Sequence, residues 1–348
     1  MIKTYPKHTI QPIFSYQNLI KSFISSKGVS DLNLYHSGSA ALFSGLQTLI
    51  AQKNIKNIFI PKFICKEVVE VVKKCNINID YYDVDLDLNI DSNNNFKKNM
   101  SVNSVILIVN YFGFSTNWNL IQHLKETYGC LVVEDNCHIL DSNRKADILS
   151  KSADLSFNSL RKVLPVLSGS ILKSNNPTII FNNKSMTTFP NFKEILYSLR
   201  GFKKSQRHPK GTKNDHVVNF NEERLSIDYF SYKIIMSDVL DIKKISSLRI
   251  DNYHIWHEFL FNKGLELFSR SMIDQTTSPY VFPCMANSLD EATKWIEWGR
   301  NKNINIIKWP DFPIDINMND IPKSLRNVLL FPVNDQHRLD IDTLNMDI

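Results

Sequence analysis

From about residue 40 to residue 175, short apolar strand patterns alternate with helix patterns. The strand patterns cover 57–61, 78–85, 104–113, 130–136 and 154–158, and the helix patterns that alternate with them cover 41–52, 65–75 and 117–129. A crossover between parallel strands needs a dozen or more residues, usually in a helix, and the intervening segments have about that length. The alternation therefore predicts an α/β fold with a mostly parallel sheet and covering helices.

After residue 175 the alternation weakens. Helix patterns at 193–202, 231–248, 250–264 and 290–302 are mixed with strand patterns at 278–286 and 303–310. A chain of 348 residues that is 43% hydrophobic and 22% charged can form one large domain and a smaller one. We expect a large domain over 1–215 and a smaller C-terminal α+β domain over 216–348.

Composition argues against several classes of protein. The chain begins without a signal-peptide pattern and has no apolar run long enough for a membrane helix, so we expect a cytoplasmic protein with no membrane contact. The net charge of +6 is modest, and the basic residues are scattered except in 201–216, which argues against nucleic-acid binding. No C-x-x-C pair or zinc-type Cys/His spacing occurs, so we expect no metal site and reduced, mostly buried thiols at Cys65, Cys75, Cys130, Cys137 and Cys284.

Three polar segments lie next to the predicted strands, where open α/β sheets bind their ligands. In HSGSAAL (36–42), Ser37, Gly38 and Ser39 directly precede a helix, whose first N–H groups could hold a phosphate; an ordinary helix cap is the alternative. In LVVEDNCHIL (131–140), the carboxylates of Glu134 and Asp135 end a buried strand. Such a carboxylate needs a cation or hydrogen-bond donors, although a capping role remains open.

The third segment is SLRKVLPVLSGS (159–170), in which Lys162 adjoins a run of Val, Leu and Pro. A lysine shielded from water loses its proton more easily and can attack a carbonyl. The alternative is a surface lysine whose methylene groups lie along apolar surface. Together the three segments fit a phosphorylated pyridine aldehyde, which needs an anion cradle, a carboxylate for its ring nitrogen and a lysine for a Schiff base.

The order and spacing of these segments resemble the DegT/DnrJ/EryC1/StrS family of pyridoxal-phosphate (PLP) sugar aminotransferases. The family's blocks run S-G-[ST]-x-A, then a proline and a segment leading to D-[VI]-D, then E-D-x-x-[HQ], then S-x-x-K and a glycine. The corresponding segments are Ser37–Ala41, Pro61–Asp85, Glu134–His138, and Ser159–Lys162 with Gly169. The resemblance is clear over residues 30–175 and faint beyond them.

The resemblance implies the three-layer aspartate-aminotransferase fold (PLP fold type I) and assigns roles to individual residues. Lys162 would hold the cofactor and then act as the base, and Asp135 would keep the pyridine nitrogen protonated. His138 would lie against the cofactor's ring or its phenolic oxygen, while Gly38, Ser39 and Ser159 would bind the phosphate.

The implied reaction moves an amino group from glutamate to a keto group of a nucleotide-linked sugar, as in polysaccharide biosynthesis. Family members with histidine in place of the lysine are similar to dehydratases instead. The resemblance also implies a homodimer with shared active sites. The segment 201–224 is the one we expect to reach the partner, where a nucleotide diphosphate could meet Lys203, Lys204, Arg207, Lys210, Lys213 and Arg224.

The chain departs from the family pattern at several positions. Cys65 occupies the position at which many members place an aromatic residue to stack on the cofactor, which makes Phe63 and Phe112 the candidates for that contact. The N-Y-R-M-[ST] block appears as SYKIIMS, without its asparagine. Two alternatives therefore stay open: a PLP-binding homologue without transaminase activity, and a PLP enzyme acting on an amino acid, such as a cysteine desulfurase using Cys137 or Cys284.

Overall fold

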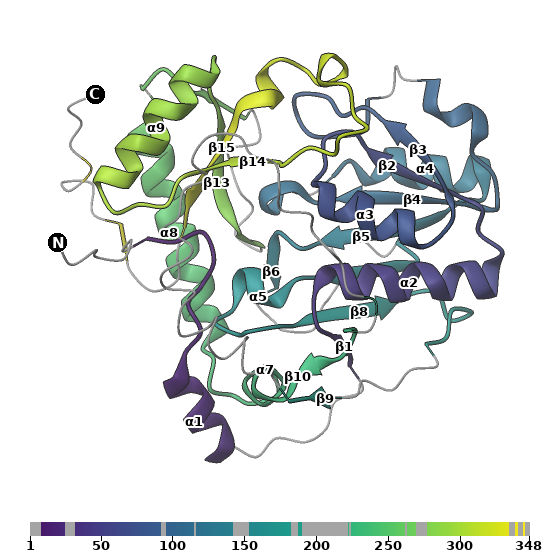
Figure 1. The fold of residues 1–348 in the computed structure, drawn as a ribbon, viewed down its shortest axis with the longest axis horizontal. Helices are drawn as coiled ribbons and strands as arrows, with labels where there is room; N and C mark the ends of the chain where they lie inside the picture. The colour runs from purple at the N-terminus through teal and green to yellow at the C-terminus, as the bar shows by residue number, and fades with distance from the viewer. Residues whose placement is uncertain are drawn as a thin grey trace.

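The computed structural model describes residues 8–24, 32–91, 95–114, 116–141, 153–181, 187–189, 222, 224–261, 263–268, 277–333, 338–339 and 344. Its largest element is a seven-stranded sheet in the order β1-β8-β7-β5-β4-β2-β3 (Figure 1). The strands are β1 (Asn33–Tyr35), β2 (Asn57–Pro61), β3 (Asn78–Tyr82), β4 (Ser104–Val109), β5 (Leu131–Asn136), β7 (Leu155–Asn158) and β8 (Ser170–Ser174).

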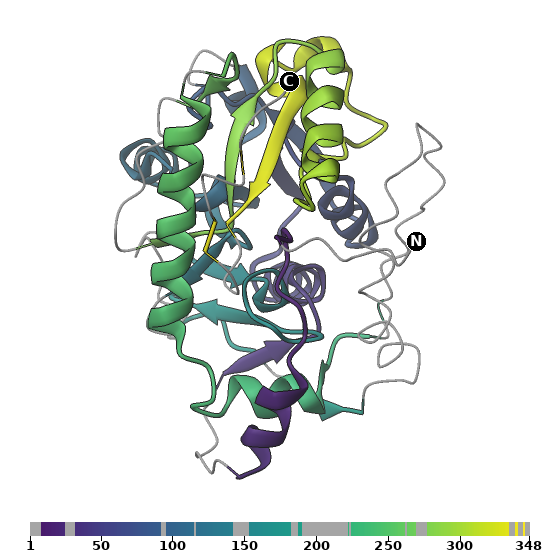
Figure 2. The ribbon, with the colours of Figure 1, turned by 90° about the vertical axis from the view of Figure 1, so that its left-hand side faces the viewer.

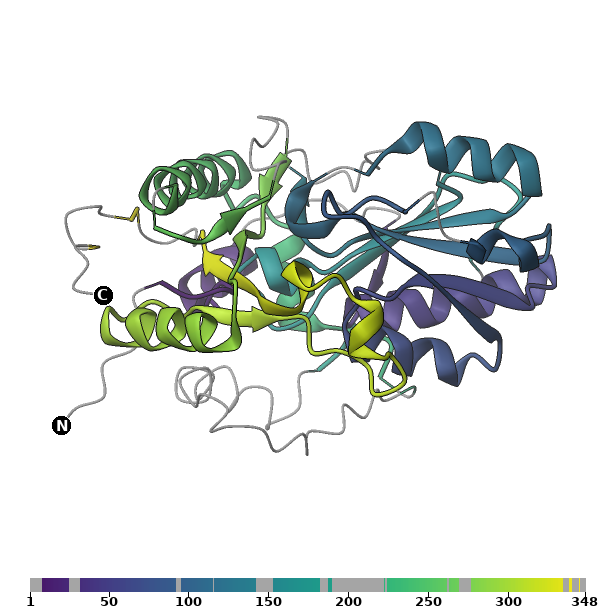
Figure 3. The same ribbon diagram turned by 90° about the horizontal axis from the view of Figure 1, so that it is seen from above.

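The five strands from β3 to β7 are parallel, whereas β8 runs antiparallel to both β7 and β1. All six residues of β4 are buried, as expected for a strand covered on both faces. Figure 3 shows the sheet between α4 (Trp118–Tyr128) on one side and α2 (Gly38–Lys53) with α3 (Lys66–Lys74) on the other. The expected three-layer α/β architecture is confirmed.

A second sheet of four antiparallel strands forms the smaller α+β part, in the order β11-β13-β15-β14. Its strands are β11 (Glu266–Leu267), β13 (Val281–Met285), β14 (Ile307–Trp309) and β15 (Val328–Pro332). They lie between α8 (Ile242–Leu260) and α9 (Leu289–Asn301), as Figure 2 shows. The predicted domain boundary at 215/216 lies outside the described residues and stays a prediction.

Several predicted elements have different bounds in the structure. The strand pattern at 104–113 ends at Val109 and is followed by the short 3-10 helix η2 (Tyr111–Gly113). The helix patterns at 231–248 and 250–264 form α7 (Tyr229–Ile235) and the longer α8, because Asp241 caps a new helix by accepting from the Lys244 amide. The helix pattern at 193–202 lies outside the described residues.

The remaining elements are short or lie outside these two sheets. They are α1 (Tyr16–Ile24), β6 (Ile139–Asp141), α5 (Leu160–Val163), β9 (Thr187–Thr188), β10 (Ile227–Asp228), β12 (Thr277–Pro279) and the 3-10 helices η1 (Asn95–Asn99), η3 (Met318–Asp320) and η4 (Ser324–Asn327). The β6–β12 pair aligns Ile139 with Pro279, so a segment from the C-terminal half lies directly beyond β5. None of the described helices is long and apolar enough to cross a membrane.

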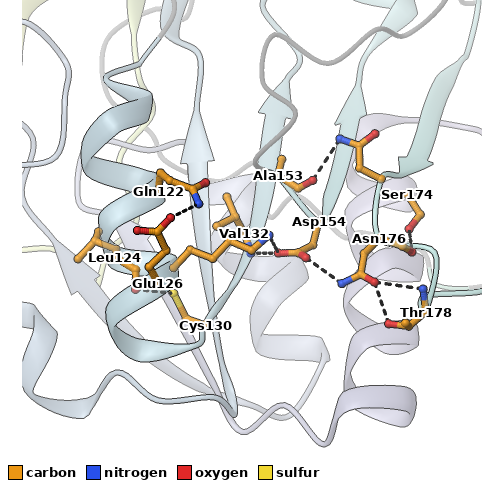
Figure 4. Close-up of polar contacts among 12 residues, drawn as sticks. Gln122, Leu124, Glu126, Cys130, Val132, Ala153, Asp154, Ser174, Asn176 and Thr178 are labelled. Atoms are coloured by element: carbon orange, nitrogen blue, oxygen red, sulfur yellow. Dashed lines mark hydrogen bonds and ion pairs between the residues drawn. The ribbon is translucent and has the colours of Figure 1, made fainter.

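Asp154 fixes the amino ends of two neighbouring parallel strands, β5 and β7. Figure 4 shows this buried carboxylate accepting hydrogen bonds from the Val132 amide at 2.9 Å and the Asn176 side-chain amide at 2.9 Å. Lys125 forms an ion pair with it at 2.9 Å. Because its partners satisfy both carboxylate oxygens, Asp154 has a structural role: it aligns the start of β7 with β5.

Candidate active site

Asp135 lies at the carboxyl end of β5, in register with Val109 of β4 and Phe157 of β7. Its side chain is buried, and the Cys137 amide donates a hydrogen bond to Oδ1 at 2.8 Å. Burial raises the pKa of this carboxyl group, while the nearby positive charge of Lys162 acts to lower it. The two groups that the sequence predicted as catalytic therefore interact electrostatically in the structure.

Lys162 lies in α5, the short helix that follows β7. A hydrogen bond from the Leu160 amide to the Gly169 carbonyl at 2.8 Å closes the loop that carries it. Gly169 has a φ of 142°, and a Cβ there would meet Ile235 Cδ1 at 3.0 Å, so the loop requires a glycine at this point. Lys162 keeps part of its surface accessible although protein surrounds most of the side chain.

The expectation that shielding would lower the pKa of Lys162 is wrong for the protein alone. Burial does act to lower this pKa, but four acidic groups outweigh it and raise the pKa above its ordinary value. In order of their effect these groups are Cys137, Tyr280, Cys65 and Asp135. Asp135 is the partner we consider decisive, because burial raises the pKa of Cys65 to about 12 and that of Cys137 well above its usual value, so both thiols are neutral near pH 7.

The amino terminus of α2 approaches these groups closely. A Cβ on Gly38 would meet Cys137 Sγ at 2.8 Å and Ser159 Cβ at 3.6 Å, so only a glycine allows this approach. Ser37 caps the helix by accepting from the Ala40 amide at 3.2 Å, and its carbonyl accepts from the Ala41 amide. Among the hydrogen bonds of the described residues, the amides of Gly38 and Ser39 have no acceptor and remain available to an anion.

His138 is held in one orientation by rings on both sides. Its ring is stacked on Phe112 at 5.7 Å and on Tyr280 at 5.1 Å, measured between ring centroids. The Phe112 amide donates to Nδ1 at 3.3 Å, which leaves Nε2 as the protonated nitrogen of a neutral ring. Burial, followed by the charge of Lys162, lowers the pKa of His138 well below its usual value.

Glu134 points away from Asp135 because successive residues of a strand face opposite sides of the sheet. Its Oε1 accepts from the side-chain amide of Asn110 at 2.8 Å, and Oε2 has no hydrogen-bond partner among the described residues. Burial raises the pKa of Glu134 to about 7. The sequence pattern paired Glu134 with Asp135, but the structure separates their surroundings.

The structure brings together Lys162, Asp135, His138, Gly38 and Ser159, and Ser39 follows Gly38 at the same helix end. Two residues at this site were not predicted from the sequence. The Lys162 Nζ lies 5.8 Å from the centroid of the Tyr280 ring, and the side chain of Trp309 lies next to the Cys65 thiol. Both come from the C-terminal part of the chain, where the only signal was that aromatic residues occur in the strand patterns at 278–286 and 303–310.

The residues of this site have the chemistry that PLP requires. Gly38 leaves room and unpaired amides at a helix amino terminus for a phosphate. Asp135 is a buried carboxylate for a protonated ring nitrogen, and Lys162 provides the amine. No cluster of His, Cys, Asp or Glu that could hold a metal occurs among the described residues.

Comparisons with solved structures agree with this architecture. Spr1654 of Streptococcus pneumoniae, whose assignment as a sugar aminotransferase is provisional, superposes in its PMP form with a TM-score of 0.69 and 14% identity, covering 98% of this chain and 95% of that one. Helicobacter pylori PseC, an aminotransferase involved in the biosynthesis of pseudoaminic acid, gives a TM-score of 0.66 and 11% identity, with coverages of 98% and 96%.

The Escherichia coli GDP-4-keto-6-deoxy-D-mannose-3-dehydratase with bound hydrated PLP gives a TM-score of 0.62 and 14% identity, with coverages of 99% and 90%. These likenesses establish the fold. No curated protein sequence matches the chain. The model of the DegT/DnrJ/EryC1/StrS aminotransferase family matches residues 23–194, which include Lys162, Asp135 and the amino terminus of α2. Over residues 23–194, just under half of its length, the chain is similar to the DegT/DnrJ/EryC1/StrS aminotransferase family.

Proposed function

We propose that the protein is a PLP-dependent aminotransferase that moves an amino group from glutamate to a keto group of a nucleotide-linked sugar. The observation that carries the proposal is the electrostatic interaction of Lys162 with the buried carboxylate of Asp135, next to the amino terminus of α2. An amine, a carboxylate and an anion cradle at the carboxyl ends of parallel strands are what this cofactor needs.

In this function the phosphate binds to the amides of Gly38 and Ser39 and to the hydroxyl of Ser159. Asp135 accepts a hydrogen bond from the protonated ring nitrogen, and its charge keeps that nitrogen protonated. His138 donates from Nε2 toward the phenolic oxygen, because its Nδ1 already accepts from the Phe112 amide. The stacked rings of Phe112 and Tyr280 prevent the imidazole from turning.

Bound PLP supplies an aldehyde that takes up the amine and a ring that accepts negative charge from the substrate carbon. Lys162 is the group proposed to move the proton, because it carries the amine of this site and its Nζ lies beside the Tyr280 ring with part of the residue accessible. The neutral thiols of Cys65 and Cys137 exclude water around it without adding charge.

The lysine at this position supports amino transfer over dehydration, since the dehydratase-like family members have histidine there. The alternative of a cysteine desulfurase gains no support. Cys284 is fully buried in β13, and burial raises the pKa of both Cys284 and Cys137 well above the usual range, which disfavours the nucleophilic thiolate. Spr1654 was solved in both a PLP form and a PMP form, and PMP is the amine-carrying counterpart of PLP that a transaminase forms.

We further propose that the protein acts in the cytoplasm as a homodimer whose subunits share active sites. Exposed apolar side chains on α1 support a second copy as partner, with exposed fractions of 65% for Ile20, 53% for Phe23 and 83% for Ile24. Of the basic residues proposed to meet a nucleotide diphosphate, only Arg224 lies within the described residues. Sedimentation of the purified protein measures the stoichiometry, and a fully active monomer would contradict the proposal.

The central test uses purified protein reconstituted with PLP. We expect a visible absorption band from the bound cofactor, and borohydride reduction should fix a pyridoxyl group to Lys162 in peptide maps. Glutamate should abolish the visible band and release 2-oxoglutarate. A label on Lys173 instead would overturn the site, and an unchanged band with glutamate would indicate a PLP-binding homologue without transaminase activity.

A further inference from the structure

Cys65 leaves the cofactor site without a ring at a position where the family often has one. The residue directly precedes α3, and its thiol is partly accessible. The Cys65 thiol interacts electrostatically with both Lys162 and Asp135, so it borders the place where the cofactor would bind. A cysteine presents much less surface to a pyridine ring than an aromatic side chain does.

Trp309 brings a ring to this place from the other part of the molecule. It ends β14 of the small sheet, and its side chain lies next to the Cys65 thiol. The indole ring lies 5.1 Å from the ring of Phe63, 5.2 Å from that of Phe112 and 5.4 Å from that of His138, measured between centroids. In all three pairs the planes are steeply inclined, by 72° to 83°, so the indole stands upright against this aromatic cluster.

Burial separates Trp309 from the other members of the cluster. Phe63, Phe112 and His138 are buried, whereas Trp309 keeps part of its surface accessible. Lys162 and Cys65 are also partly accessible. Of these three partly accessible residues, only Trp309 has a ring.

The segment that follows Trp309 is fixed to the large sheet's side of the molecule. The Lys66 amide donates to the Asp311 carbonyl at 2.9 Å, and the Lys66 ammonium pairs with the Asp311 carboxylate at 2.5 Å. Further pairs join Lys73 to Asp315 and Lys62 to Asp320. A single exposed pair contributes little, but three pairs and a backbone hydrogen bond within twelve residues act together to hold the indole in place.

We propose that Trp309 replaces the aromatic residue missing at Cys65 and covers the face of the bound cofactor, so that cofactor binding depends on a side chain of the small sheet. This inference rests on the proposed function, because it assumes that PLP binds at Lys162. Trp309 is then a positioning and binding residue supplied by β14, and the three Lys–Asp pairs keep it at the site.

The test is a ring exchange between the two positions. The proteins compared are the wild type, Trp309→Ala, Trp309→Phe, Cys65→Phe and the double variant Cys65→Phe/Trp309→Ala, with PLP itself as the ligand. Dissociation constants come from titrations of the visible band, and borohydride labelling reports whether PLP is attached to Lys162. Loss of stacking and contact area should weaken PLP binding by Trp309→Ala about ten-fold or more.

Trp309→Phe should retain most of the affinity, and the double variant should bind PLP within about three-fold of the wild type, since its ring is restored from the other side. Trp118→Ala, which truncates a partly buried tryptophan at the start of α4, is the matched control and should leave the PLP affinity unchanged. Urea unfolding of each variant checks that the comparison is made between folded proteins.

The outcomes separate this inference from the proposed function. If the wild type acquires no label on Lys162, the proposed function fails and this inference fails with it. If Lys162 is labelled but Trp309→Ala binds PLP as the wild type does, only this inference is overturned. It is also overturned if Trp309→Ala weakens binding and the double variant does not recover, because Trp309 would then only hold the two parts together.

Discussion

Substitution of Gly38 by alanine tests the close approach on which the proposed phosphate site depends. The added Cβ would lie 2.8 Å from Cys137 Sγ, 3.4 Å from the Asn158 carbonyl oxygen and 3.6 Å from Ser159 Cβ. The first distance is shorter than van der Waals contact allows, so either the start of α2 or Cys137 must move. Cys137 is itself buried, with an exposed fraction of 8%.

Two opposing effects set the magnitude. Overpacking of a tight interior costs about 1–3 kcal/mol. Alanine in place of glycine stabilises a helix interior by about 0.5–1 kcal/mol, and by less at Gly38, which is the first helical residue. We therefore expect Gly38→Ala to lower the free energy of unfolding by about 1–2 kcal/mol. PLP binding should weaken by about ten-fold or more, because the displaced amides are those proposed to hold the phosphate.

Gly45→Ala in the same helix is the matched control. Its Cβ would meet the methyl ends of Leu172 at 3.3 Å and of Leu155 at 3.4 Å, and such methyl groups can shift slightly. The helix gain then offsets the crowding, so its stability should stay within about 1 kcal/mol of the wild type and its PLP affinity should be unchanged. Urea unfolding and titration with PLP measure both quantities. Equal behaviour of Gly38→Ala and Gly45→Ala would refute the argument from the close approach.

Three further substitutions test the remaining groups of the site. Lys162→Ala should abolish both the borohydride-fixed pyridoxyl label and amino transfer, while its circular dichroism spectrum stays unchanged. Lys173→Ala, a substitution outside the site, should keep the label and the amino transfer. A label retained by Lys162→Ala would contradict the role proposed for Lys162. Asp135→Asn should still bind PLP but turn over glutamate at least roughly 10²–10³-fold more slowly, which is the rate loss expected when one strong interaction with developing charge is removed. A wild-type rate for this variant in a stopped-flow assay would show that Asp135 has only a structural role. Glu134→Gln should change how stability depends on pH. Burial raises the pKa of Glu134 from 4.5 to about 7, so the folded protein binds this proton more tightly than the unfolded chain does. The bound proton therefore contributes fully to the free energy of unfolding below pH 4.5, and this contribution is lost as the pH rises to about 7. This loss of folding stability amounts to about 3 kcal/mol and should be absent in Glu134→Gln. If the free energies of unfolding of the wild type and Glu134→Gln, measured with urea, change in parallel from pH 5 to pH 8, the prediction is contradicted.

The order of helices and strands could be predicted where burial leaves a continuous local pattern. The strand at 104–109 is apolar from Val105 onward because it is covered on both faces, and this makes it recognisable. β8 was not predicted, since its sequence SILKS begins and ends with polar residues whose partners come from elsewhere: Ser170 Oγ donates to the Asn158 carbonyl. The break between α7 and α8 could have been predicted, because Asp241 before an apolar-periodic run is a helix-start signal.

The site residues that lie in short sequence motifs could be predicted, whereas the properties that depend on residues distant in sequence could not. Asp135, Ser159, Lys162 and Gly38 lie in short motifs at the ends of elements that the parallel topology brings to one edge of the sheet, so sequence spacing was enough to group them.

The charge state of Lys162 could not be predicted in this way. The apolar run beside it suggested a lowered pKa, but the acidic groups that raise it come from three separate segments, one of which contains Tyr280, 118 residues further along the chain. The pKa of a buried amine depends on the sum of its neighbours in space, and a sequence window around Lys162 contains none of them. The same reasoning applies to Trp309, which reaches Cys65 because the segment that follows β14 is bound to the start of α3 through Lys66 and Asp311. The loss of a cofactor-stacking ring at Cys65 could therefore be noticed in the sequence, while its proposed replacement could not.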